Sequence, residues 1–76
     1  MRPIKIDEEQ FRTLHSLGAP VFWAGIDPGT LACMSANNLQ SWANEDYKKN
    51  VEDIVLCMKS RMHEHGAFYA LVDSDA

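Results

Sequence analysis

The stretch PVFWAGIDPGTLACMS, residues 20–35, decides the fold because it determines how many strands the sheet contains. Its two apolar runs, Pro20–Ile26 and Thr30–Ser35, include β-branched and aromatic side chains, which are typical of strands. Between them lies the turn segment Asp27-Pro28-Gly29-Thr30, whose residues favour a type I or type II turn. The pattern predicts a β-hairpin. Its register stays open, because tight hairpins prefer the mirror-image turn types.

The N-terminal part predicts one strand followed by one helix. Residues Arg2–Ile6 alternate in polarity as a short strand does. Asp7 is placed to cap a helix, with Gln10 at the reciprocal position of a capping box. Three apolar residues at helical spacing and a terminating glycine follow: Phe11, Leu14, Leu17 and Gly18.

The C-terminal half predicts one long helix and one strand. From Asn37 to His65 the apolar residues recur every three or four positions, which is the spacing of an amphipathic helix. A break near Ala43 is a second option, since Asn44 can also cap a helix start. A strand follows over Ala67–Val72, and residues 73–76 are expected to fray. The strand has Phe68, Ala70 and Val72 on one face and Tyr69 and Leu71 on the other.

The expected element order is therefore β-α-β-β-α-β in a single α+β domain that spans residues 1–76. This is the order of the split βαβ, or ferredoxin-like, arrangement. We expect a two-layer domain in which both helices cover one face of a four-stranded antiparallel sheet. A chain of 76 residues has room for one hydrophobic core.

Composition and charge exclude several classes of protein. Eleven acidic and seven basic residues give a net charge of −4, so we expect no direct binding to nucleic acid, which needs a basic surface. No apolar stretch approaches the roughly 20 residues of a membrane span, and we expect no membrane association. Cys33 and Cys57 lack the spacing of a metal or redox motif, which favours reduced thiols and a cytoplasmic location.

An apolar surface on the open side of this sheet is the main candidate binding site. In a two-layer domain the sheet face without helices is exposed, and exposed apolar patches mark interfaces. The residues predicted to bind a partner there are Val21, Trp23, Met34, Tyr69 and Leu71. The alternatives are that the tail or the long helix covers this face, or that the hairpin register is shifted by one residue.

A second candidate surface is acidic. Four carboxylates lie on the predicted long helix beside two lysines: Glu45, Asp46, Glu52 and Asp53, with Lys48 and Lys49. Because acids and lysines four positions apart pair on a helix, a solvated face is the simple interpretation. The functional alternative is an acidic surface that occupies the basic groove of a partner, as mimics of nucleic acid do.

The segment Gly25-Ile26-Asp27-Pro28-Gly29-Thr30 resembles the first-strand motif of RuvC-type junction nucleases in the RNase H-like superfamily. The resemblance implies that Asp27 binds a catalytic metal and that carboxylates on later strands complete a two-metal site. The later acids of this chain lie on a predicted helix, so we interpret the segment as a turn. The imidazoles of His63-Glu64-His65 diverge on a helix. We expect no metal, no cofactor and no catalytic residues.

The sequence therefore predicts a small non-enzymatic regulator or inhibitor that acts by stoichiometric occlusion of a protein partner, for which a basic protein would suit the net charge of −4. In size and charge it is similar to proteins of phages and mobile elements, such as anti-CRISPR proteins. A homodimer is a further expectation. The alternatives are a ferredoxin-like domain that senses a small ligand and, more remotely, a fragment of a metal-dependent nuclease.

Overall fold

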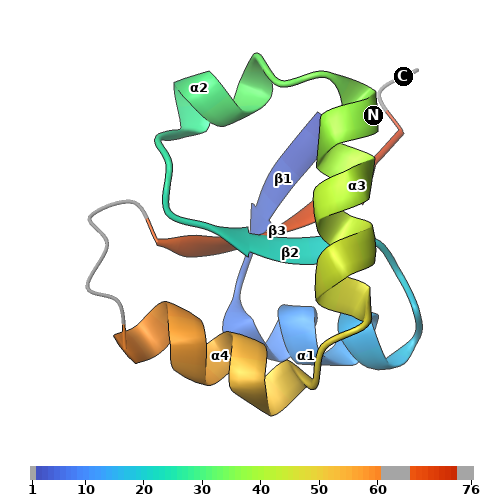
Figure 1. Ribbon diagram of the computed structural model, residues 1–76, viewed down its shortest axis with the longest axis vertical. Helices are drawn as coiled ribbons and strands as arrows, with labels where there is room; N and C mark the ends of the chain where they lie inside the picture. The colour runs from blue at the N-terminus through green and yellow to red at the C-terminus, as the bar shows by residue number, and fades with distance from the viewer. Residues whose placement is uncertain (1, 61–65, 74–76) are drawn as a thin grey trace.

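The computed structural model describes residues 2–60 and 66–73, which form an α+β domain of three strands and four helices (Figure 1). Along the chain the order is β1 (Arg2–Ile6), α1 (Glu8–Ser16), β2 (Val21–Ala24), α2 (Pro28–Ala32), α3 (Ala36–Tyr47), α4 (Val51–Ser60) and β3 (Ala67–Val72). Within these ranges, each helix is too short or too polar to cross a bilayer.

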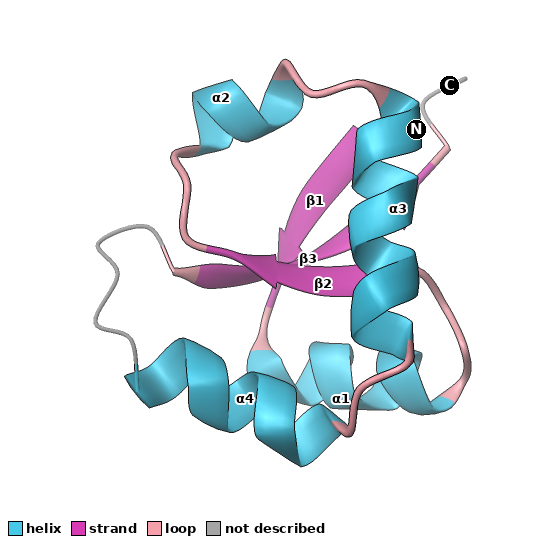
Figure 2. Cartoon of the chain, viewed as in Figure 1, coloured by secondary structure: helices cyan, strands magenta, loops and turns pink. Residues whose placement is uncertain are grey.

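The sheet has the order β1-β3-β2, so the last described strand lies in the middle (Figure 2). β3 pairs antiparallel with both neighbours, with Ile4 opposite Ala70 and Phe22 opposite Tyr69. Because β1 and β2 both run opposite to β3, they run parallel to each other, and α1 connects them across β3. This β1-α1-β2 connection is a split βαβ unit. The sheet that the described residues form has three strands, so the prediction of four is wrong.

The second half of the expected hairpin is a helix instead of a strand. Asp27 caps α2, because its Oδ1 accepts a hydrogen bond from the N–H of Thr30 at 3.1 Å. Pro28 occupies the first helical turn, where a backbone without an N–H loses no hydrogen bond. Leu31 is buried and anchors the short helix to the core. The hairpin prediction is therefore wrong, since Asp-Pro-Gly starts a helix here.

The helix predicted from Asn37 to His65 is interrupted. The segment Lys48-Lys49-Asn50 separates α3 from α4, and residues 61–65 lie outside the described part of the chain. The side-chain oxygen of Asn50 accepts a hydrogen bond from the N–H of Glu52 at 2.8 Å, which satisfies a free donor at the start of α4. The chain thus breaks five to seven residues after the alternative near Ala43, which is buried inside α3.

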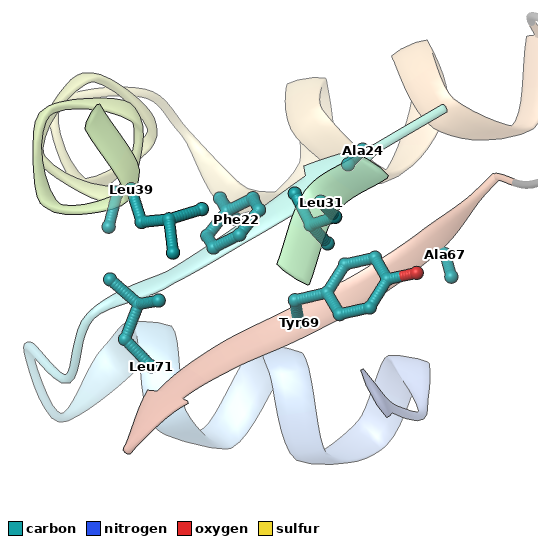
Figure 3. Packing of buried hydrophobic residues seen from close by; sticks show 8 residues of the cluster. Phe22, Ala24, Leu31, Leu39, Ala67, Tyr69 and Leu71 are labelled. Carbon is teal, nitrogen blue, oxygen red and sulfur yellow. The ribbon is translucent and has the colours of Figure 1, made fainter. Parts of the chain in front are cut away.

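Helices cover both faces of the sheet, so the two-layer expectation is wrong. On one face α2 and α3 form a core cluster with the strands: Phe22, Ala24, Leu31, Leu39, Ala43, Ala67, Tyr69 and Leu71 (Figure 3). On the other face α1 and α4 form a second cluster: Phe11, Val21, Ile54, Val55, Phe68 and Ala70. Successive residues of β2 and β3 alternate between the two clusters, which confirms the predicted alternation.

The predicted limits of α1 are confirmed. The carboxylate of Asp7 accepts a hydrogen bond from the N–H of Gln10 at 2.7 Å, and the Gln10 side chain accepts one from the N–H of Asp7 at 3.0 Å. At the other end Gly18 has a φ of +79°, and the N–H of Ala19 donates to the carbonyl of Leu14 at 3.0 Å. This is a Schellman termination, which places a glycine in the left-handed region.

Candidate functional site

The structure buries most of the predicted partner-binding residues. Val21, Tyr69 and Leu71 have exposed fractions of 1%, 4% and 7%. Trp23 is partly buried on the α1/α4 side of the sheet, whereas Met34 is partly buried on the α2/α3 side. The expected open sheet face is wrong, because helices occupy both faces and the sheet separates these residues into two clusters. A contact between them and a partner stays a prediction.

The predicted acidic residues do not form one surface. Glu45 lies near the end of α3, whereas Glu52 and Asp53 lie in the first turn of α4, and these three are exposed. Asp46 is only 2% exposed and belongs to the interior. The expectation of four carboxylates on one helix face is therefore wrong, because the segment between α3 and α4 changes the chain direction.

Asp46 links three elements at the end of α3. Its Oδ2 accepts a hydrogen bond from the backbone N–H of Trp23 at 3.2 Å, on the edge strand β2. Its Oδ1 lies 3.3 Å from the ammonium of Lys49, and its carbonyl oxygen lies 3.2 Å from Nε2 of His15 on α1. A buried carboxylate needs such partners, since burial without them costs free energy. Asp46 therefore fixes the end of α3 against β2 and α1.

Ion pairs between partly exposed side chains link the neighbouring helices α1 and α4. Glu8 contacts Lys59 at 2.8 Å and Arg12 at 3.1 Å, and Arg12 also pairs with Glu52. The hydrogen bonds from Lys59 and then Arg12 lower the pKa of Glu8 below its ordinary value. The hydrogen bond from Arg12 likewise lowers the pKa of Glu52, while Glu52 and then Glu8 raise the pKa of Arg12. The network holds two helices together.

The last turns of α1 and α3 lie close to each other (Figure 1). Each of these two helix ends carries a large apolar side chain that is exposed. Leu17 is 75% exposed and Tyr47 is 57% exposed. The ring of Tyr47 lies beside Gly18, since a Cβ added to Gly18 would be 3.7 Å from Cε2 of Tyr47. The His15 ring lies 6.2 Å from the Tyr47 ring, between centroids. We call Leu17, Gly18 and Tyr47 the Leu17–Tyr47 corner.

The sequence places Leu17 with Phe11 and Leu14 in one apolar stripe of α1, but the structure does not bury Leu17 with them. Each step of three residues turns a helix by about 300°, so two steps move Leu17 about 120° away from Phe11 around the axis. Phe11 is completely buried, whereas Leu17 is the C-cap and projects beyond the last turn. Residues that follow one another at steps of three move progressively around the helix, away from the buried side. This displacement is the sequence signal that identifies Leu17 as an exposed residue.

A hollow of about 330 Å³ lies beside α1. The described residues that line it are Asp7, Glu9, Gln10, Thr13 and Leu14. Leu14 is partly buried and supplies an apolar wall, whereas Glu9 is exposed. Asp7 is engaged in the capping box. The hollow is therefore an amphipathic depression with carboxylates at the end where α1 begins.

The segment resembling a nuclease motif is the start of α2. The Asp27 carboxylate accepts hydrogen bonds from the backbone N–H and the hydroxyl of Thr30. Within residues 2–60 and 66–73, no three His, Cys, Asp or Glu side chains gather closely enough to hold a metal ion. The triplet His63-Glu64-His65 lies outside the described residues. Cys33 and Cys57 are free thiols.

The Leu17–Tyr47 corner is therefore the candidate binding surface, since it presents two large apolar side chains to solvent at adjoining helix ends. Comparisons with models of protein families, with curated proteins and with solved structures found no match to this chain.

Proposed function

We propose that this chain is a small protein-binding domain without catalytic activity, a regulator or inhibitor that occupies the surface of a protein partner at one-to-one stoichiometry. The observation that supports the proposal is the Leu17–Tyr47 corner, where side chains that are 75% and 57% exposed lie at adjoining helix ends. The binding surface proposed now differs from the one expected from the sequence, since it lies at a corner and not on the sheet.

An exposed pair of this kind favours association. A single exposed leucine is ordinary on a protein surface, whereas neighbouring large apolar groups form a patch whose removal from water is favourable by about 25 cal/mol for each Å². Tyrosine is also enriched at the centres of interfaces, because its ring is apolar and its hydroxyl can still hydrogen-bond. Leu17 and Tyr47 together supply both properties.

The corner is held in place by the rest of the fold. Gly18 ends α1 in a Schellman motif, and Asp46, which precedes Tyr47, is fixed by its hydrogen bond to β2. Binding therefore orders little additional chain, which lowers the entropic cost of association. Glu45 and Lys48, whose charged groups are 4.0 Å apart, lie one turn or less from Tyr47 in the sequence and supply polar groups of both signs.

Site-specific photo-crosslinking tests the proposal. A benzophenone amino acid replaces Tyr47 in one variant and Leu56 in another, and both variants are irradiated in the cells that make the protein. Leu56 is a matched control, because it is 68% exposed but lies on α4, where Glu52 and Lys59 are close in sequence on the same side. We expect position 47 to yield one defined crosslinked protein, identified by mass spectrometry, and position 56 to yield none.

Two further measurements complete this test. The identified partner should bind the purified chain at one-to-one stoichiometry, and Leu17→Ala and Tyr47→Ala should each weaken that binding about tenfold or more, as interface anchors do. Circular dichroism checks that both variants keep the fold. Equal crosslinking at positions 47 and 56, or unchanged affinity of both alanine variants, would contradict the proposal.

A further inference from the structure

One face of α1 combines a protruding side chain with a hollow. Gln10, Thr13, Leu14 and Leu17 follow the spacing that places residues on one side of a helix, and we call them the α1 stripe. At the end of the stripe Leu17 projects into solvent, with 75% of its surface exposed. At its beginning Gln10, Thr13 and Leu14 line the hollow of about 330 Å³. The stripe thus has a knob at one end and a recess at the other.

We infer that the α1 stripe is a contact between two copies of this chain, which pack α1 antiparallel to α1 about a two-fold axis. In that arrangement the end of one stripe lies against the beginning of the other, so Leu17 of each copy enters the hollow beside Gln10 and Leu14 of the second copy. A two-fold contact uses the same patch on both molecules, and the knob and the recess are each used twice. The inference names a partner for the proposed Leu17 surface and to that extent rests on the proposed function.

Charge selects a second copy and sets its orientation. Asp7 and Glu9 lie at the beginning of α1. Lys48 follows Tyr47, whose ring lies beside Gly18; the Lys48 side chain is 72% exposed, and its ammonium lies 4.0 Å from Glu45. Lys49 pairs with the buried Asp46 at 3.3 Å and takes no part in the contact. An antiparallel contact with Leu17 opposite Gln10 brings Glu9 opposite Gly18 of the second copy, next to its Lys48. Glu9 of each copy can then compete with Glu45 for Lys48 of the other copy, whereas a parallel contact would bring Glu9 against Glu9.

The length of α1 sets the strength of the contact. A helix of nine residues is about 14 Å long, so an α1–α1 contact buries less than the roughly 1,200 Å² of a standard stable interface. We therefore expect a weak, rapidly exchanging dimer whose dissociation constant lies at about 10 µM or above. An association of this strength leaves the monomer available to another protein at low concentration.

Analytical ultracentrifugation of the purified full chain measures this equilibrium. Sedimentation runs from about 10 µM to about 1 mM cover the range in which small contacts associate. We expect the average mass to rise with concentration from the monomer value of 8.6 kDa toward twice that value. A chain that stays monomeric at about 1 mM overturns the inference.

A matched pair of leucine variants locates the contact. Leu17→Ser should raise the dissociation constant at least tenfold, which corresponds to about 1.4 kcal/mol, whereas Leu56→Ser should leave it within about twofold. Both leucines are strongly exposed, at 75% and 68%, so neither substitution removes core packing, and thermal melting checks the fold. A dimer that Leu56→Ser weakens as much as Leu17→Ser overturns the inference.

A charge swap tests the antiparallel orientation without changing an apolar residue. Glu9→Lys and Lys48→Glu should each weaken the dimer several-fold at low salt, and the double variant Glu9→Lys/Lys48→Glu should restore it, because both pairs are reversed together. Failure of the double variant to recover dimerisation overturns the inference. A monomeric chain that still crosslinks through position 47 to another protein removes the homodimer and leaves the proposed function standing.

Discussion

Asp46 occupies a position that helix electrostatics disfavours. It lies in the last turn of α3, where the partial negative charge of the helix end repels a carboxylate. Its side chain is also 2% exposed, so water does not solvate the charge. The hydrogen bond from the Trp23 N–H and the contact with the Lys49 ammonium offset both costs. Asp46 therefore bonds α3 to the outer edge of β2, on the side of this strand that faces away from β3.

Replacement of this carboxylate should be costly. We expect Asp46→Ala to lower the free energy of unfolding by about 1 to 3 kcal/mol, because it removes a buried acceptor that bonds β2. Asp46→Asn keeps one carbonyl oxygen and should cost less. Urea denaturation measures all variants, with Asp53→Ala as the exposed control that should change stability by no more than about 0.5 kcal/mol. A loss no greater for Asp46→Ala than for Asp53→Ala would show that the link is not a source of stability.

Gly18 is needed for its backbone conformation and not for lack of space. A Cβ at this position would meet Tyr47 at 3.7 Å, an ordinary contact distance, but the φ of +79° is unfavourable for other residues. We expect Gly18→Ala to lower the free energy of unfolding by about 1 to 2 kcal/mol, and Gly18→Asn by less, since asparagine tolerates this region. Thermal melting compares the two variants. Equal stability of the alanine variant and the parent chain would refute the backbone argument.

At the scale of elements, the ion pairs between α1 and α4 should make stability depend on pH. Because Glu52 has a lowered pKa in the folded chain, its contribution is present above the ordinary value of 4.5 and is lost as the pH falls through the folded pKa. Glu52→Gln should therefore lower the melting temperature at neutral pH, and the difference from the parent chain should vanish in strong acid and shrink at about 1 M salt.

Asp53→Asn is the matched control for this experiment, since Asp53 is an exposed carboxylate of the same first turn of α4. Both substitutions remove one negative charge near the positive helix end, so their difference isolates the pair with Arg12. Differential scanning fluorimetry across the acid range measures both variants. Parallel pH profiles for the two variants would argue against a role for the ion pair.

The elements that the sequence predicts correctly have strong local signals. The capping box of Asp7 and Gln10 and the glycine at position 18 act within a few residues, and the structure confirms both ends of α1. The segment from Asp27 is ambiguous at this scale, because Asp followed by Pro serves equally as a turn and as a helix N-terminus. The apolar residues that follow it favoured the prediction of a strand. In the structure Leu31 is the one buried residue of α2, and it anchors this short helix to the core.

The arrangement of helices on the two faces of the sheet depends on contacts between residues that are far apart in the sequence. Local sequence patterns carry no information about these contacts. Alternation in β2 and β3 predicts two apolar faces correctly, but not which helices cover each face. The spacing of apolar residues continues without a gap through Tyr47 and Val51, so the break that sends α3 and α4 to opposite faces is not visible in it. The prediction of an open sheet face is wrong for the same reason, since helices cover both faces.

The position of β3 makes the fold of the whole molecule depend on its last described strand. β1 and β2 pair only through β3, and both core clusters contain β3 residues. A chain ending at Gly66 should therefore show no cooperative thermal transition and poor dispersion in amide NMR spectra. A chain ending at Asp73 keeps β3 and should remain folded. A cooperative transition in the shorter chain would refute this dependence.

The same topology has a consequence for biosynthesis. Residues 2–60 leave the ribosome before the strand that joins β1 to β2, so neither sheet face can close during most of translation. About 48 residues are added between the end of β2 and the end of β3, so at about 5 to 20 residues per second the apolar side chains of β2 stay uncovered for roughly 2 to 10 seconds. Chaperones that bind short apolar segments have this interval in which to act, and the yield of folded protein should respond to their supply and to translation speed.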